Sequence, residues 1–361
     1  YLRQSSVTIW KGAPQRDRRI KPSLVIFLLA VGLLFTSFWS LNFGAVDTSG
    51  VSAVWLWLFD SAALSQVQKI VVFDIRLPRI ILGCLVGAAL AIAGVMLQGL
   101  FRNPLADPSI IGVTAGASLG AVCAIVFGSM IISSVWPAVG LYLVPLTAFA
   151  GGACTTFLLY YFATYRGQTS VATLLLAGIA IAALISALTG LLIFVANDEQ
   201  LRDFTFWSLG SLAGATWSKV VTVGPVLGLM IFSSPLFAVG LNAFALGEAE
   251  AKHLGIRIQL FKSMTIANVA LGVGAAVAVS GSISFIGIVA PHLLRLVIGP
   301  DNRFLLPASA LLGAVLLLLA DALARQIVAP AELPIGILTA AFGAPFFLAV
   351  LLMRRGQILE N

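Results

Sequence analysis

Ten apolar stretches joined by short polar connections occupy most of this 361-residue sequence. They are residues 24–43, 77–101, 109–132, 141–163, 171–196, 219–240, 262–283, 285–298, 304–328 and 335–353. A helix needs roughly 20 mostly apolar residues to cross a bilayer. Only 10% of the residues are charged, against about 25% in an ordinary soluble domain. The pattern predicts an all-α polytopic membrane protein of about ten transmembrane helices.

The connections between the stretches are too short to hold a second soluble domain. The chain is therefore expected to consist of a basic cytosolic tail, residues 1–23, and one transmembrane domain, residues 24–356. The stretch 285–298 is short and contains Pro291 and His292. It predicts a tilted or partly buried helix.

The basic residues indicate the orientation. With the N-terminus inside, 15 of the 21 Lys and Arg residues fall on the inner side. Cytoplasmic loops carry this excess, so we expect the N-terminus inside. An even number of helices then places the C-terminus inside as well. The net charge of +7 is explained in the same way, so membrane lipid and not nucleic acid is the expected contact.

The sequence contains an internal repeat. Residues 87–94 (GAALAIAG) resemble residues 274–281 (GAAVAVSG) at an offset of 187 residues, and Pro104 meets Pro291 at the same offset. The two copies fall on the second and seventh stretches, which cross the membrane in opposite senses. Inverted repeats of this kind are typical of transporters.

Glycines also recur at four-residue spacing, as Gly83/Gly87 and Gly112/Gly116/Gly120. Small residues at this spacing let membrane helices approach closely. We expect helix packing at these positions rather than pore lining.

No constellation of catalytic residues is visible. His253 and His292 lie on different segments, and Cys84, Cys123 and Cys154 lack metal-ligand spacing. No Gly-x-x-x-x-Gly-Lys-Ser/Thr phosphate loop occurs in the sequence. We therefore expect no enzyme activity, no cofactor and no metal, and any ATP that drives this protein must bind to another chain.

Acidic residues are scarce inside the apolar stretches. Asp321 is the main one, and Arg325 follows one helical turn later, which predicts a local ion pair. An ion-coupled secondary transporter usually keeps several ionisable groups as a relay near the midplane. That class remains the alternative to an ATP-driven importer, together with a membrane scaffold that transports nothing.

The polar loop 241–257 differs from the other connections. Helix-forming residues fill the interval between Gly247 and Gly255, and apolar and charged residues alternate there. The pattern predicts a short amphipathic helix on the cytosolic face. Such a helix could rest on lipid headgroups or press against a partner protein, and the pattern does not separate the two.

Several blocks in one order resemble the FecCD family of ABC importer permeases, which handles iron-siderophore, haem and vitamin B12 substrates. The blocks are residues 76–79 (RLPR), 98–108 (QGLFRNPLADP), 245–247 (ALG), 253–255 (HLG), 285–292 (FIGIVAPH) and 331–336 (AELPIG). The resemblance implies ten helices, a permease homodimer, two ATP-binding-cassette ATPase subunits and a periplasmic substrate-binding protein. It also implies a multi-pass protein of the bacterial inner membrane.

The resemblance assigns roles to two sets of residues. The segment that couples to the ATPase would contain Ala245, Leu246, Gly247, Glu248, His253, Leu254 and Gly255. The residues that dock the binding protein would be Arg76, Arg79 and Arg325, because an Arg fork pairs well with a carboxylate. The other interpretation of these arginines is anchorage of helix ends at the lipid interface.

The expected substrate is haem, because the stretch 299–334 looks most like that of haem importers. Ferric siderophore and cobalamin are the alternatives within the family. His292 is interpreted as a structural residue and not as an iron ligand, since the resemblance gives a Pro-His pair to members whose substrates lack haem.

Overall fold

The computed structural model describes residues 20–42, 49–60, 64–132, 140–166, 168–329 and 331–359. Most of the expected basic tail, residues 1–19, lies outside this part of the chain. The helices are α1 (Pro22–Ser40), α2 (Gly50–Phe59), α3 (Gln66–Gln68), η2 (Lys69–Arg76), α4 (Leu77–Leu100), η3 (Pro108–Ile111), α5 (Val113–Ile132), α6 (Gly140–Ala163), α7 (Val171–Val195), α8 (Asp198–Ser208), α9 (Trp217–Ser233), η5 (Ser234–Phe237), α10 (Ala238–Leu246), α11 (Glu248–His253), α12 (Ile258–Ser280), α13 (Ile286–Ile298), α14 (Asn302–Ile327) and α15 (Ile335–Leu359). Two short strands, β1 (Thr164–Tyr165) and β2 (Gln168–Thr169), form an antiparallel pair.

All ten apolar stretches are helical, as α1, α4, α5, α6, α7, α9, α12, α13, α14 and α15. Seven helical segments in the described residues are long and apolar enough to cross a membrane, and three of the predicted stretches form shorter apolar helices. The all-α, multi-pass prediction is confirmed. The helices α2 and α8 were not predicted, and the second span begins at Gln66 instead of residue 77.

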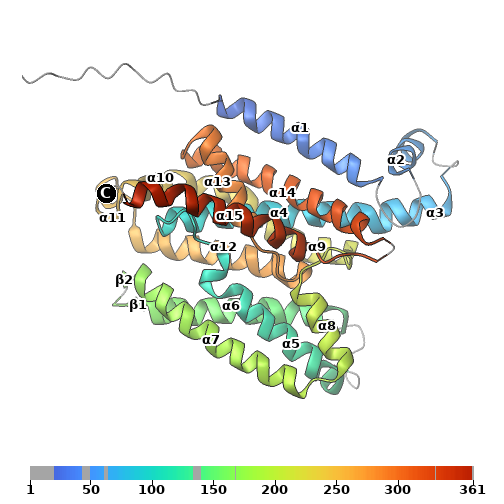
Figure 1. The fold of residues 1–361 in the computed structure, drawn as a ribbon, viewed down its shortest axis with the longest axis horizontal. Helices are drawn as coiled ribbons and strands as arrows, with labels where there is room; N and C mark the ends of the chain where they lie inside the picture. The colour runs from blue at the N-terminus through green and yellow to red at the C-terminus, as the bar shows by residue number, and fades with distance from the viewer. Residues whose placement is uncertain are drawn as a thin grey trace, which may run out of the picture.

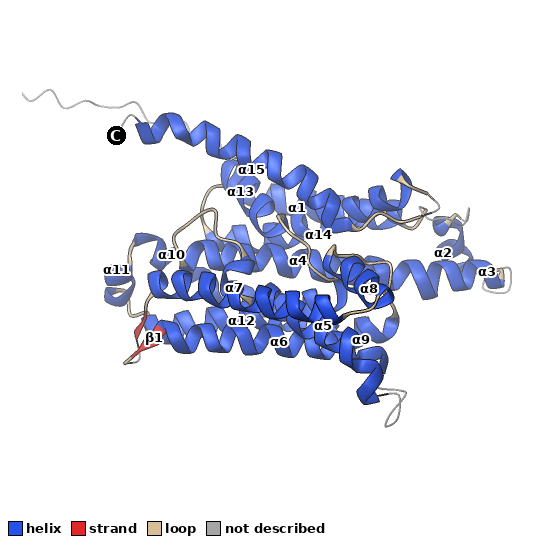
Figure 2. Ribbon diagram, turned by 60° about the horizontal axis from the view of Figure 1, so that its bottom comes forward, coloured by secondary structure: helices blue, strands red, loops and turns tan. Residues whose placement is uncertain are grey.

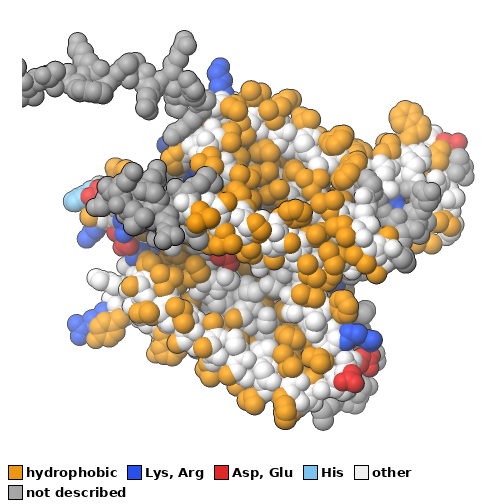
Figure 3. All heavy atoms as spheres, viewed as in Figure 1, with side chains coloured by type: hydrophobic (Ala, Val, Ile, Leu, Met, Phe, Trp, Pro, Cys, Tyr) orange, Lys and Arg blue, Asp and Glu red, His pale blue; other side chains and the backbone are white. Residues whose placement is uncertain are grey.

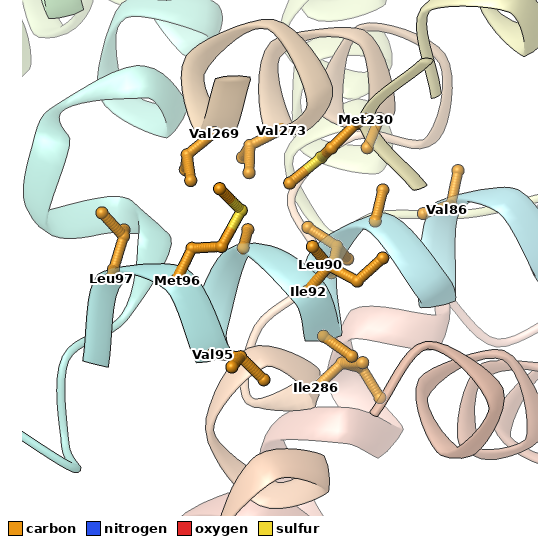
Figure 4. Close-up of a cluster of buried hydrophobic side chains, with 14 of the residues drawn as sticks. Val86, Leu90, Ile92, Val95, Met96, Leu97, Met230, Val269, Val273 and Ile286 are labelled. Carbon is orange, nitrogen blue, oxygen red and sulfur yellow. The ribbon is translucent and has the colours of Figure 1, made fainter. Parts of the chain in front are cut away.

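The long helices run side by side in one bundle, with α4 at its centre (Figures 1 and 2). Of the seven membrane-length segments, Gln66–Leu100 is the most deeply buried. Apolar side chains of α4, such as Ile92 and Met96, meet Met230 of α9 and Val273 of α12 (Figure 4). These side chains belong to the buried apolar core around α4.

The glycines of the spacing motifs lie at helix contacts. A Cβ on Gly87 of α4 would strike the backbone of Gly313 on α14. On α5, Gly116 faces Gly151 and Gly120 faces Thr147, both on α6. Close backbone approach of this kind is how membrane helices associate, so the packing interpretation is confirmed at these positions.

The two ends of the bundle differ. The start of α1 and the end of α15 lie at the same end as α10 and α11, whereas α2 and α3 lie at the opposite end (Figures 1 and 2). The repeat-bearing helices α4 and α12 begin at opposite ends, so they run antiparallel. Hydrophobic side chains cover the middle of one face, and charged side chains gather toward the ends (Figure 3). This arrangement suits a bundle that spans a bilayer lengthwise.

Candidate functional site

The coupling segment, residues 241–257, forms the end of α10, all of α11 and the turn that follows. Gly247 separates the two helices with φ +129°. Residues with a side chain rarely adopt this backbone conformation, so the break between the helices depends on glycine. The predicted short helix between Gly247 and Gly255 is present, as α11.

The end of α11 is a Schellman turn. The amide of Gly255 donates to the carbonyl of Lys252, and the amide of Ile256 donates to the carbonyl of Ala251, both at 3.0 Å. Gly255 itself has φ +86°. This helix ending needs a left-handed residue at the position of Gly255, which glycine adopts without steric cost.

The surface of the coupling segment is mixed in character. Leu246 and Leu254, at the two ends of α11, are 67% and 64% exposed, whereas Ala251 is fully buried. Acidic residues occupy the first turn of α11 and basic residues the last, which complements the helix dipole. Two exposed leucines beside charged groups give this end of the bundle a surface that a partner protein could contact.

The coupling segment is tied to the bundle by a buried lysine. The Nζ atom of Lys262, on α12, lies 2.9 Å from the carboxylate of Glu248 and 3.0 Å from the carbonyl oxygen of Thr169 in β2. The side chain of Gln259 also accepts from the amide of Thr169, at 2.9 Å. One cation thus joins α11, α12 and the β1–β2 hairpin.

At the opposite end of the bundle, Arg79, Asp321, Arg325 and Glu332 form the arginine cluster. The guanidinium of Arg79 donates to Asp321 at 2.8 and 3.0 Å and to Glu332 at 2.9 and 3.0 Å. Arg325 pairs with the other carboxylate oxygen of Asp321 at 3.0 Å and donates to the hydroxyl of Ser40 at 2.6 Å. The predicted Asp321–Arg325 ion pair is confirmed, and Asp321 serves a second arginine as well.

The three predicted docking arginines are buried in this structure. Arg76, Arg79 and Arg325 are 4%, 6% and 7% exposed. Arg76 donates to the carbonyl oxygen of Leu41 at 2.6 Å. Their guanidinium groups are enclosed by protein, so the geometry by itself displays neither a free docking contact nor an anchor at a helix end. A carboxylate from another protein would have to exchange with a group that these arginines already contact.

Glu332 is the one member of the arginine cluster that sequence reasoning gave no role. It lies 253 residues from Arg79, and its side chain is 37% exposed, whereas that of Asp321 is fully buried. The block 331–336 did stand out by resemblance, but a contact across such a separation has no local signal. The acid inside an apolar stretch, Asp321, was the only hint of a buried pair.

His292 lies on α13 and is 7% exposed. Its ring meets Phe346 of α15 edge to face, with 5.8 Å between ring centroids. An apolar cavity of about 380 Å³ lies nearby between α13, α14 and α15, and Phe285, Phe342 and Phe346 are among its lining residues. In the described part of the chain, no three His, Cys, Asp or Glu side chains gather as a metal site would require.

The model of the FecCD transport family matches residues 32–354. Three curated permeases are similar over most of their length. The hemin transport system permease protein HmuU of Yersinia pestis is 41% identical over 341 residues, which cover 94% of this chain and 98% of that protein. The cobalamin import system permease protein BtuC of Halobacterium salinarum is 43% identical, over 81% of this chain and 76% of that protein. The Fe(3+)-citrate import system permease protein YfmD of Bacillus subtilis is 36% identical, over 94% and 95%.

A solved structure shares the fold. It is described as an inward-facing conformation of a metal-chelate type ABC transporter, and it superposes with a TM-score of 0.80 at 35% sequence identity. The match covers 92% of this chain and 99% of that one. The arrangement of helices is therefore that of an ABC importer permease.

Proposed function

The chain belongs to the FecCD transport family, and on that premise we propose that this ABC importer permease moves haem across the membrane. The observation that carries the proposal is the similarity to the hemin permease of Yersinia pestis, which extends over 98% of that protein. Cobalamin is the second candidate, because the Halobacterium permease is 43% identical.

Uptake into proteoliposomes tests the substrate. The permease is reconstituted with its ATPase subunits, and the binding protein of the same host is loaded with haemin, cyanocobalamin or ferric citrate. We expect ATP-dependent accumulation of haemin, and an excess of the other two compounds should not compete. Accumulation of cyanocobalamin alone would replace haem by the second candidate and leave the importer assignment intact.

We further propose the assembly that the family implies: two copies of this chain, two ATP-binding-cassette subunits and one external binding protein. The coupling segment would receive the motion of the ATPase subunits. Its exposed leucines and the dipole-matched charges of α11 support this role. The arginine cluster, at the other end of the bundle, would face the binding protein.

A substitution at Gly255 tests the coupling role. No atom lies within 4 Å of a Cβ built there, so the cost of a side chain comes from φ +86° and not from a clash. We expect Gly255→Trp to abolish coupled transport or assembly with the ATPase, while the membrane helices still insert. Gly255→Asn is the matched control, because Asn tolerates the left-handed region, and it should keep most of the activity. Normal haemin uptake per ATP in the Trp variant would count against the segment's role.

Docking on the arginine cluster would proceed by exchange at Glu332. With Arg76 included, the site holds three positive and two negative side chains, and Glu332 is the exposed carboxylate. An acidic residue of the binding protein could take its place on the fork of Arg79. Arg suits such an exchange because its planar fork binds carboxylates bidentately.

If an acidic residue of the binding protein displaces Glu332, substitutions of Glu332 and Arg76 should change the affinity for that protein in opposite directions. We expect Glu332→Gln to strengthen binding of the binding protein, because it removes the competing carboxylate. Arg76→Gln should weaken binding, and added salt should weaken binding to the unmodified chain. Both substitutions leave the pairs of Asp321 in place. Affinities measured in nanodiscs at two salt concentrations decide the matter, and unchanged affinity in both variants would refute docking on the arginine cluster.

A further inference from the structure

A polar contact joins the coupling segment to the start of α14. The side-chain amide of Asn242, on α10, donates to the carboxylate of Asp301 at 2.7 Å. Its amide oxygen accepts from the backbone and side-chain nitrogens of Asn302, at 2.9 and 2.7 Å. Asn302 is 6% exposed, whereas Asn242 and Asp301 are half-buried, so the contact is partly shielded from competing water.

The contact also fixes the beginning of α14. Asp301 is the N-cap of that helix, and its carboxylate accepts from the amide of Arg303 at 3.0 Å. Partial burial alone would raise the pKa of Asp301, but the hydrogen bonds from Arg303 and Asn242 hold the pKa below its ordinary value. The cap is thus an ionised carboxylate held by α10 and α14 together. A hydrogen-bonded network of this kind favours one relative position of the two helices.

From this point α14 runs the length of the bundle. It has 26 residues, which is about 39 Å at 1.5 Å per residue. Near its far end it carries Asp321 and Arg325 of the arginine cluster. Between the two ends, the close approach of Gly313 to Gly87 holds it against α4. One helix therefore connects the coupling segment with the arginine cluster.

We propose that Asn242 is a positioning residue that makes α14 move with the coupling segment, so that α14 links the ATPase-facing end to the arginine cluster. This inference rests on the proposed function of both ends. Coupling between two sites is reciprocal in binding free energy. Docking at the arginine cluster would then alter ATPase engagement through the same helix.

The test measures how strongly the haemin-loaded binding protein stimulates ATP hydrolysis by the assembled transporter in nanodiscs. We expect Asn242→Ala to reduce this stimulation at least about five-fold, the low end of ordinary coupling energies. The matched control is Asn268→Ala. It removes another interhelical amide bond, from Asn268 to the hydroxyl of Ser233 at 2.9 Å, and should leave the stimulation unchanged. Melting temperatures of all variants show whether a loss merely follows stability.

Exchanging the amide of Asn242 and the carboxylate of Asp301 gives a more specific test. Asn242→Asp alone places two carboxylates face to face and should abolish stimulation. The double variant Asn242→Asp/Asp301→Asn restores an amide opposite a carboxylate with the donor reversed, and it should recover most of the stimulation. If Asn242→Ala does not assemble, Asn302→Ala removes one bond only and should give a partial loss.

The outcomes distinguish a failure of the Asn242 link from a failure of the proposed function. Full stimulation in Asn242→Ala or Asn302→Ala, with a normal response of the unmodified transporter, would overturn the role of Asn242. Equal losses in Asn242→Ala and Asn268→Ala would do the same, because the effect would then be general. If the unmodified transporter shows no stimulation, the proposed function fails, and this inference fails with it.

Discussion

Asp321→Asn is expected to destabilise the protein by about 3–5 kcal/mol, the usual cost of removing one partner from a buried ion pair. Asp321 is fully buried and pairs with two arginines that are themselves almost inaccessible. The isosteric amide keeps the shape and removes the charge. Arg79 would then retain Glu332, whereas the buried Arg325 would keep the neutral hydroxyl of Ser40 and lose the carboxylate that pairs with it.

The measurement is the thermal midpoint and the yield of monodisperse protein in one detergent. Glu332→Gln is the control, because its carboxylate pairs with the same Arg79 but is 37% exposed. Exposed pairs contribute about 0–1 kcal/mol, so that variant should melt close to the unmodified chain. Equal, small shifts in both variants would show that Asp321 does not hold the arginine cluster together.

Gly94→Ala is expected to destabilise the contact between α4 and α13, although alanine is the better helix former. A Cβ at Gly94 would fall well inside the contact distance of the Gly287 carbonyl oxygen, and that atom is backbone. Relief requires the two helices to separate. Overpacking of this kind costs about 1–3 kcal/mol. Lipid solvates the separated helix surfaces without a hydrophobic cost, so little opposes the separation.

Gly32→Ala is the matched control, because it adds the same methyl group at a site where no loss of stability is expected. Gly32 lies on α1, and no atom lies within 4 Å of a Cβ built there. The substitution should be neutral or should stabilise the helix by up to about 1 kcal/mol. Both variants are compared by thermal midpoint. A Gly94→Ala variant that melts at or above the unmodified chain would mean that α4 and α13 do not approach as closely as described.

The membrane helices could be predicted from the sequence because apolar length is a local property. The second span shows that apolar length alone does not give the boundary of a membrane helix. Its apolar run begins at residue 77, yet the helical segment begins at Gln66 and contains Arg76. The charge of the following Arg79 is balanced by Asp321 and Glu332, which are 242 and 253 residues away. The predicted stretch 77–101 includes Arg79 but leaves out Arg76, because a window along the sequence does not contain the acceptor of Arg76, the carbonyl oxygen of Leu41.

Other features had local signals that were not used. The helix α8 starts with a capping box between Asn197 and Gln200, a recognisable beginning of a helix. The coupling segment was located by its glycines, and its helix α11 was predicted correctly. The contact of Asn242 with Asp301 and Asn302 could not be predicted, because it depends on how α10 and α14 meet in space.

ATP-driven uptake of haemin into proteoliposomes tests the account most directly. The permease is reconstituted with its ATPase subunits and presented with haemin-loaded binding protein, with ATP inside or outside and with or without a proton gradient. We predict accumulation that requires ATP and the ATPase subunits and is unaffected when the gradient is collapsed. Accumulation that follows the gradient in the absence of ATP would contradict the account and identify an ion-coupled transporter instead.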